Sequence, residues 1–143
     1  MLLVVDTNIL FTFFWKNSAF QEIIKTKQVT LISPSYALAE ITKYKEEIQK
    51  KAKISQQEFE AKRENLNEII KFVNIQEYKG CFHEIKNSIK DLTKDQQEEL
   101  LSDIDFLALA KAKNRSLWSN DKELKKQKTV IIITTEELIK LLA

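Results

Sequence analysis

The sequence predicts an α/β fold: a three-layer α/β/α sandwich with a mostly parallel central sheet of about five strands. Short apolar segments rich in β-branched residues alternate with longer segments of helical periodicity along the 143-residue chain. Such alternation is typical of a parallel sheet with helices on both faces. The chain has one Gly and one Pro, too few for many tight hairpins, which also favours helical connections.

Composition narrows the class of protein further. The length fits one domain and no linker or internal repeat interrupts it, so we expect residues 1–143 to form a single domain. The formal net charge of +2 does not by itself indicate nucleic-acid binding. A single cysteine allows no internal disulfide, and no apolar run approaches the roughly 20 residues of a membrane helix. We therefore expect a cytoplasmic protein.

The first strand and the turn that ends it, residues 3–9, form the segment around which the other elements are placed. Leu2 to Val5 is a short apolar run, typical of a central strand buried on both faces. Further strands are expected at residues 28–32, 72–75, 116–119 and 130–133. Helices are expected at residues 8–15, 19–26, 34–48, 56–70, 82–92, 94–101, 103–114, 121–126 and 135–142.

Local signals predict where several helices begin. Ser33 is expected as an N-cap, with Pro34 at the first helical position. Capping-box patterns begin at Ser55, Thr93 and Thr134. The highly charged stretch 43–64 keeps helical periodicity and predicts a projecting helical hairpin. Segment 55–101 is interpreted as a helical, insertion-like middle part of the domain.

Acidic side chains recur where the predicted strands end or the following helices begin. Asp6 ends the first strand, Asp121 follows the fourth, and Asp103 opens the helix that leads into the fourth. Glu40 lies about two turns into the helix after the second strand. Because the carboxyl ends of parallel strands share one edge of a sheet, we expect these carboxylates to gather in one cleft if the first and fourth strands are neighbours.

Such a carboxylate cluster needs a compensating positive charge, because neighbouring carboxylates repel one another and raise one another's pKa values. A divalent cation resolves the repulsion, and Mg²⁺ and Mn²⁺ prefer hard oxygen ligands. A cation held there can stabilise charge that develops on a phosphoryl group during hydrolysis. The candidate metal ligands and catalytic residues are therefore Asp6, Glu40, Asp103 and Asp121.

Each of these acids also has a purely structural interpretation. Asp6 and Asp121 are suited to cap the helices that follow them. Glu40 fits a solvated helix face. Asp103 fits a favourable interaction with a helix dipole. The set is more informative than any member, because all four fall where a parallel sheet would bring them together.

Two longer motifs and the segments between them carry a family resemblance. The strongest are Val4-Val5-Asp6-Thr7-Asn8-Ile9-Leu10 and Leu117-Trp118-Ser119-Asn120-Asp121. Between them lie Ser33-Pro34, Leu38-Ala39-Glu40-Ile41 and the run Asp103–Ala110. In this order, the motifs resemble the PIN domain family, nucleases that include VapC-type toxins and RNA-maturation endonucleases.

The resemblance implies an α/β/α fold and Mg²⁺- or Mn²⁺-dependent cleavage of a phosphodiester, most often in RNA. It also implies a homodimer. The positions that match the four family acids are, in order, Asp6, Glu40, Asp103 and Asp121. Those that match the supporting polar residues are Asn8 and Ser119.

Two features depart from the family pattern. Asp105 lies close to Asp103, so it is either a further or alternative ligand, or the third residue of a capping box begun by Ser102. We favour the capping box. Segment 55–101 is longer and more helical than in a compact toxin, and the resemblance assigns it no role.

Lysine runs follow two of the candidate ligands and predict a basic rim around an acidic floor. One run follows Glu40 and the other follows Asp121. The candidate substrate-binding residues in these runs are Lys43, Lys45, Lys122 and Lys125. A solvated Lys/Glu face is the competing interpretation. Trp15, Tyr44 and Trp118 are candidates for base stacking, although a core position is preferred for Trp15 and Trp118.

We therefore predict a metal-dependent endoribonuclease, either a toxin paired with an antitoxin protein or an RNA-processing enzyme. Its partners would be an RNA substrate, a second copy of the chain and, for a toxin, the antitoxin. The alternative is a catalytically inactive PIN-like module that binds RNA or protein. A haloacid-dehalogenase-type phosphatase is disfavoured, because Asn8 stands where that class needs a second Asp.

Overall fold

A five-stranded parallel sheet forms the centre of the molecule. The computed structural model describes all residues from 1 to 143. The strands are β1 (Leu2–Val5), β2 (Thr30–Pro34), β3 (Ile70–Val73), β4 (Leu117–Trp118) and β5 (Ile132–Ile133). Their spatial order is β3-β2-β1-β4-β5, and every neighbouring pair is parallel. β1 and β4 are therefore neighbours, as the predicted cleft requires.

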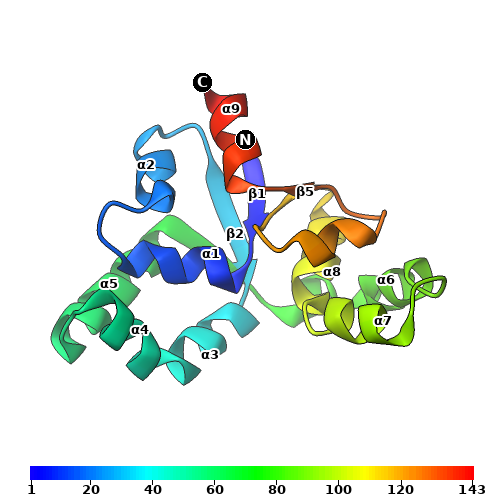
Figure 1. Cartoon of the computed structure of the whole chain (residues 1–143), viewed down its shortest axis with the longest axis horizontal. Coiled ribbons are helices and arrows are strands. Elements are labelled where there is room, and N and C mark those ends of the chain that lie inside the picture. Colours follow the sequence, from blue (N-terminus) through cyan, green and yellow to red (C-terminus); the bar gives the residue numbers. More distant parts are fainter.

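Helices cover both faces of this sheet, which confirms the predicted three-layer architecture (Figure 1). The α-helices are α1 (Thr7–Phe11), α2 (Ala19–Lys25), α3 (Tyr36–Lys43), α4 (Lys45–Ala52), α5 (Gln56–Ile69), α6 (Phe82–Ser88), α7 (Lys94–Leu101), α8 (Ile104–Lys113) and α9 (Thr135–Leu142). Short 3-10 turns are η1 (Thr12–Phe14), η2 (Ile75–Glu77), η3 (Lys79–Cys81) and η4 (Lys122–Lys126). In Figure 1, α1, α2 and α5 lie on one side of the strands, and α6, α7 and α8 lie on the other.

The core is continuous through the sheet. Val4 and Val5 of β1 are fully buried, as expected for a central strand covered on both faces. Every residue of α8 from Phe106 to Ala110 is also buried, because this helix lies between the sheet and α6. Its small alanines allow that close approach on both sides. None of the helices combines the length and apolar character that a membrane-spanning helix needs.

The three predicted capping boxes are present. In each, the N-cap hydroxyl accepts from the N–H three residues later, and that residue's side chain accepts from the N-cap N–H. They begin at Ser55, Thr93 and Thr134.

The predicted helix start at Ser33 and Pro34 is wrong, because both residues belong to β2 and the helix begins two residues later, with Ser35 as N-cap. The Thr30 N–H donates to the Met1 carbonyl at 2.7 Å, and in a parallel ladder every second residue of β2 donates to β1 in the same way. The Val5 carbonyl therefore faces residue 34, where proline has no N–H to donate. The Ser33 hydroxyl donates to that carbonyl instead, at 2.8 Å.

The predicted helix 34–48 is in fact two helices. It breaks at Tyr44, whose backbone angles (φ −98°, ψ 17°) are not helical. The charged stretch beyond it forms the expected helical hairpin, with Lys53 in the left-handed region between α4 and α5. The hairpin does not project freely, because Ile48, Phe59 and Leu66 bury it against the rest of the core.

Other boundaries differ by a few residues. The predicted helix 8–15 is a short α-helix followed by a 3-10 turn. β3 begins at Ile70, directly from α5, because Ile70 adopts extended angles and pairs with Leu31 of β2. β4 and β5 contain two paired residues each. α6 ends at Ser88, earlier than residue 92, and a tight turn follows it.

Candidate active site

The four predicted acids lie at the carboxyl edge of the parallel strands. Asp6 directly follows β1, and Asp121 lies three residues after the end of β4. Glu40 is in the middle of α3, which follows β2. Asp103 is the N-cap of α8. Three of these charges act on the fourth: Asp6, Asp121 and Glu40 all raise the pKa of Asp103.

Asp6 is the most buried of the acids, with a relative exposure of 6%. Its pKa is raised to about 6, mainly by burial and to a smaller extent by the charges of Asp121 and Glu40. Hydrogen bonds from the Ser119 hydroxyl and the Ile9 N–H oppose it. The Ile9 N–H donates to Oδ1 at 2.9 Å, so Asp6 also caps α1. The structural and the functional interpretations of Asp6 are therefore compatible.

The pKa of Asp103 is raised further than that of Asp6. Burial first, and then the charges of Asp6, Asp121 and Glu40, raise its pKa to about 7. It occupies the N-cap position of α8, but its side chain makes no capping hydrogen bond. The carboxylate is therefore not committed to holding the helix. Glu99 of α7 adds a further charge to this group, which the sequence did not predict.

Glu40 is held by a residue that sequence reasoning missed. The Thr7 hydroxyl, on a buried side chain of α1, donates to Glu40 Oε1 at 2.6 Å. Tyr36 was also missed: the charge of Glu40 raises the pKa of its hydroxyl, with smaller contributions from burial and Asp105. The pattern Asp6-Thr7 contained the only available signal for Thr7, and Tyr36 stands four residues before Glu40, one helical turn away.

Asp121 is exposed and also has a structural role. Its Oδ1 accepts from the Glu123 N–H at 3.0 Å, which caps the 3-10 turn η4. Its own N–H donates to the Ser119 hydroxyl oxygen at 3.1 Å. Ser119 is fully buried and thus connects Asp121 with Asp6. The supporting role that the resemblance implies for Ser119 stays a prediction.

The capping box favoured for Asp105 is absent. Ser102 ends α7, and its hydroxyl donates to the Glu99 carbonyl at 2.6 Å. Asp105 instead accepts from the Tyr78 hydroxyl, with Oη and Oδ1 2.9 Å apart. Burial, and then this hydrogen bond, raises the pKa of Tyr78. Asp105 therefore has a protein partner that occupies one of its oxygens.

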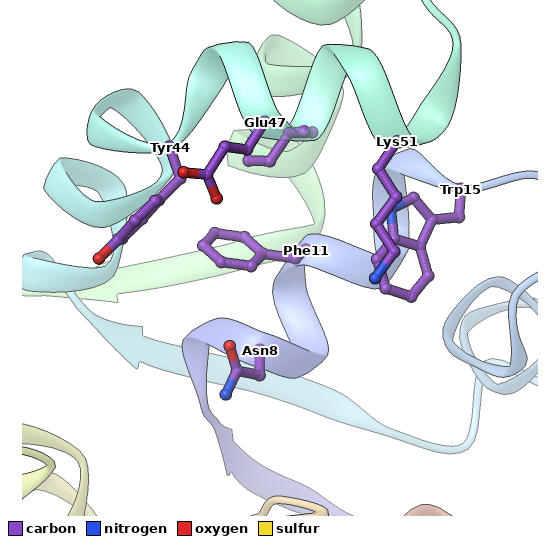
Figure 2. A pocket seen from close by; sticks show the side chains of 7 residues that line it. Asn8, Phe11, Trp15, Tyr44, Glu47 and Lys51 are labelled. Atoms are coloured by element: carbon purple, nitrogen blue, oxygen red, sulfur yellow. The ribbon is translucent and has the colours of Figure 1, made fainter.

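The Asn8 side chain makes no contact with the buried acids through a hydrogen bond. It is exposed and lines a cavity together with Phe11 and Tyr44 (Figure 2). No hydrogen bond of its side chain to Asp6 is formed, unlike those of Ile9 and Ser119. Its proposed supporting role remains a prediction.

The candidate lysines differ in their freedom to bind a substrate. Lys45 pairs with Glu60 at 3.3 Å, and Lys125 pairs with Glu137 at 2.7 Å. Lys43 lies near the acids, because its charge lowers the pKa of Tyr36. The lysine that directly follows Asp121 in η4 is the exposed Lys122.

The donor set fits a hard divalent cation by its chemistry. All four candidate ligands are carboxylates, and the pKa values of Asp6 and Asp103 are raised in part by the repulsion that a cation would relieve. No group of three or more His, Cys, Asp or Glu side chains is close enough to enclose an ion. The carboxylates therefore do not form a closed set of ligands in this structure, and a bound cation would need water to complete its coordination.

Fold and site together define an α/β protein with a carboxylate cluster at the carboxyl edge of its parallel sheet. A family model for the PIN domain matches residues 4–141, so the chain belongs to the PIN domain family, which is a family of nucleases. Among solved structures, the chain is similar to VapBC2 from Rickettsia felis, bound to a DNA fragment from its promoter. The TM-score is 0.70 at 18% sequence identity, over 94% of this chain and 98% of that one. A search of curated proteins finds no significant match.

Proposed function

We propose that the protein is a nuclease that uses Mg²⁺ or Mn²⁺ to hydrolyse phosphodiester bonds in RNA. The observation that carries the proposal is the raised pKa of Asp6 and of Asp103 in a cluster of four carboxylates. Structural ion-pair networks also shift pKa values, but these two acids have no cationic partner. Membership of a nuclease family supports the same conclusion.

Each acid has a proposed role. Asp6 and Asp103 hold the cation, and Asp121 adds a direct or water-mediated contact. When bound, the cation supplies positive charge that stabilises the charge developing on the phosphoryl oxygens. Glu40, fixed by the Thr7 hydroxyl, orients the attacking water. No His or Lys base is needed for this arrangement.

The substrate would be held by lysines at the rim of the cluster. Lys43 and Lys122 contact phosphates directly. Lys45 and Lys125 can join them only by leaving their carboxylate partners. Such partly exposed pairs contribute about 0–1 kcal/mol each, so exchanging them for phosphate contacts costs little.

Cleavage of a labelled single-stranded RNA tests the proposal. We expect the wild type to cleave with Mn²⁺ and not with EDTA, and Asp6→Asn to cleave at least about 100-fold more slowly, because a metal ligand is lost. Asp91→Asn is the matched control, since Asp91 is an exposed aspartate in the turn between α6 and α7. Equal cleavage by wild type and Asp6→Asn would refute the metal site.

A second proposal concerns the biological setting. The similar Rickettsia felis protein is described as part of the VapBC2 pair bound to promoter DNA. We propose that this chain is likewise the toxin of a toxin–antitoxin pair, with an antitoxin protein and a second copy of itself as partners. Expression of the wild type should then arrest growth of a host, and Asp6→Asn should relieve the arrest. Harmless expression of a folded, RNA-cleaving wild type would contradict the toxin role.

The inactive module remains the competing function. It predicts that the protein binds the same RNA but leaves it intact with Mg²⁺ or Mn²⁺. The cleavage assay therefore separates the two functions when binding is measured on the same samples.

A further inference from the structure

A cavity of about 310 Å³ opens between α1 and α4, beside the acid cluster. None of the roles proposed above uses it. Its walls combine aromatic rings with an amide, a carboxylate and an ammonium group (Figure 2). The residues that supply these groups are Phe11, Trp15, Tyr44, Asn8, Glu47 and Lys51.

Each wall of the cavity is close to one of the acids along the chain, although none of the four acids lines it. Asn8 lies two residues after Asp6, in the first turn of α1. Tyr44 lies one turn after Glu40, and its N–H donates to the Glu40 carbonyl at 3.0 Å. One helical turn advances about 5.4 Å along the axis. A group held in the cavity is therefore a near neighbour of the bond that the acids would act on.

The walls offer aromatic surface and polar groups of the kinds that contact a nucleobase. Phe11 and Tyr44 meet edge to face, with ring centroids 5.9 Å apart and an interplanar angle of 68°. Asn8 and Glu47 lie on opposite sides of the Phe11 ring (Figure 2). Either polar group can bond the amino or carbonyl groups at the edge of a base, while one of the rings supports a flat face.

Positive charge also accompanies the rings. Lys51 Nζ lies 4.4 Å from the Trp15 ring centroid, and Lys43 Nζ lies 5.3 Å from that of Tyr44. Neither ammonium group is in a salt bridge. Each ammonium group lies over its ring, and a combination of aromatic rings with cations that can contact the phosphate backbone is typical of single-stranded nucleic-acid binding.

We infer that this cavity holds one unpaired nucleobase of single-stranded RNA, at a nucleotide next to the bond that is cut. The inference rests on the proposed function, because it names the part of the RNA substrate that the site would recognise. A base within a duplex is already stacked and paired, so the cavity selects single-stranded RNA.

Binding of a fluorescein-labelled single-stranded oligoribonucleotide, followed by anisotropy in EDTA, tests the inference without cleavage. Tyr44→Leu should weaken binding roughly 5- to 150-fold, the range for loss of one stacked base. Tyr44→Phe keeps the ring and should bind as the wild type does. Phe72→Leu removes a half-buried ring on the edge strand β3 and is the matched control. Binding to a duplex of equal length should not depend on residue 44.

A second variant guards against a fault in folding. Phe11→Leu removes the other ring of the pair and should weaken binding in the same way, with circular dichroism verifying both folds. Wild-type affinity in both folded variants would overturn the inference and leave the cavity to a protein partner. Failure of the nuclease proposal would give a different result: the RNA would stay intact with Mn²⁺ in the wild type and in both Tyr44 variants.

Discussion

Asp103 and Asp6 are the residues of the acid cluster whose ionisation lowers the free energy of unfolding most. Their pKa values of about 7 and about 6 in the folded protein compare with an ordinary value of 3.8. Between these values the folded state binds more protons than the unfolded state. The free energy of unfolding must therefore fall as the pH rises from about 4 to about 7. Glu137, whose pKa is lowered to about 2, titrates below this window.

We predict that the metal-free protein is less stable at pH 8 than at pH 5, measured by urea unfolding in EDTA. Asp103→Asn removes a charge that is costly because it is partly buried and because it repels its neighbours, so at pH 8 the variant should exceed the wild type in stability by about 1–3 kcal/mol, allowing for the partial exposure of Asp103. Asp91→Asn should change stability by less than about 0.5 kcal/mol. A wild type with equal stability at both pH values would contradict the raised pKa values of Asp6 and Asp103.

At this scale the sequence predicted the acids but not the groups around them. Asp6 and Asp103 could be identified because strand ends and helix starts are readable from local patterns. Thr7 and Glu99 could not, since their contacts with the cluster depend on how α1, α3, α7 and α8 pack together, whereas Tyr36 lies one turn from Glu40 in the same helix. A hydroxyl that holds a carboxylate leaves no periodic signal in a sequence.

At the level of secondary-structure elements, β2 extends through Pro34, where the sequence predicted the start of a helix. Ser-Pro is a good local signal for a helix start, and here the sheet overrides it. Pro34 lies in the ladder at a position where its missing N–H leaves Val5 C=O without a donor, and Ser33 supplies the hydrogen bond. This carbonyl immediately precedes Asp6, so the contact also holds the strand end from which the acid projects.

Ser33→Ala should therefore destabilise the protein by about 1–3 kcal/mol, the cost of leaving a buried carbonyl unsatisfied. Ser88→Ala is a suitable comparison: it also removes a hydroxyl that donates to a carbonyl, but at the exposed end of α6. That variant should lose less than about 0.5 kcal/mol. Urea unfolding of both variants measures the difference, and equal losses would mean that Ser33 is not needed to complete the ladder.

For the molecule as a whole, the alternation of elements was sufficient to predict the layers and the parallel sheet. The adjacency of β1 and β4 was a condition of the predicted cleft, and the strand order meets it. β4 and β5, with two paired residues each, were located only approximately, because so short a strand is defined by its partners and not by its own sequence. The packing of the α4–α5 hairpin was likewise set by tertiary contacts such as that between Phe14 and Phe59.

Titration of Mn²⁺ by calorimetry in two buffers of different ionisation enthalpy tests the central claim most directly, because it reports cation binding and proton release together. At pH 6.5, acids with pKa values of about 6 and about 7 carry roughly one proton between them, and a cation must displace it. We predict one binding event that releases about one proton at pH 6.5 and almost none at pH 8.5, and that is lost in Asp6→Asn. Binding with no proton release at pH 6.5, or binding that survives in Asp6→Asn, would contradict the account.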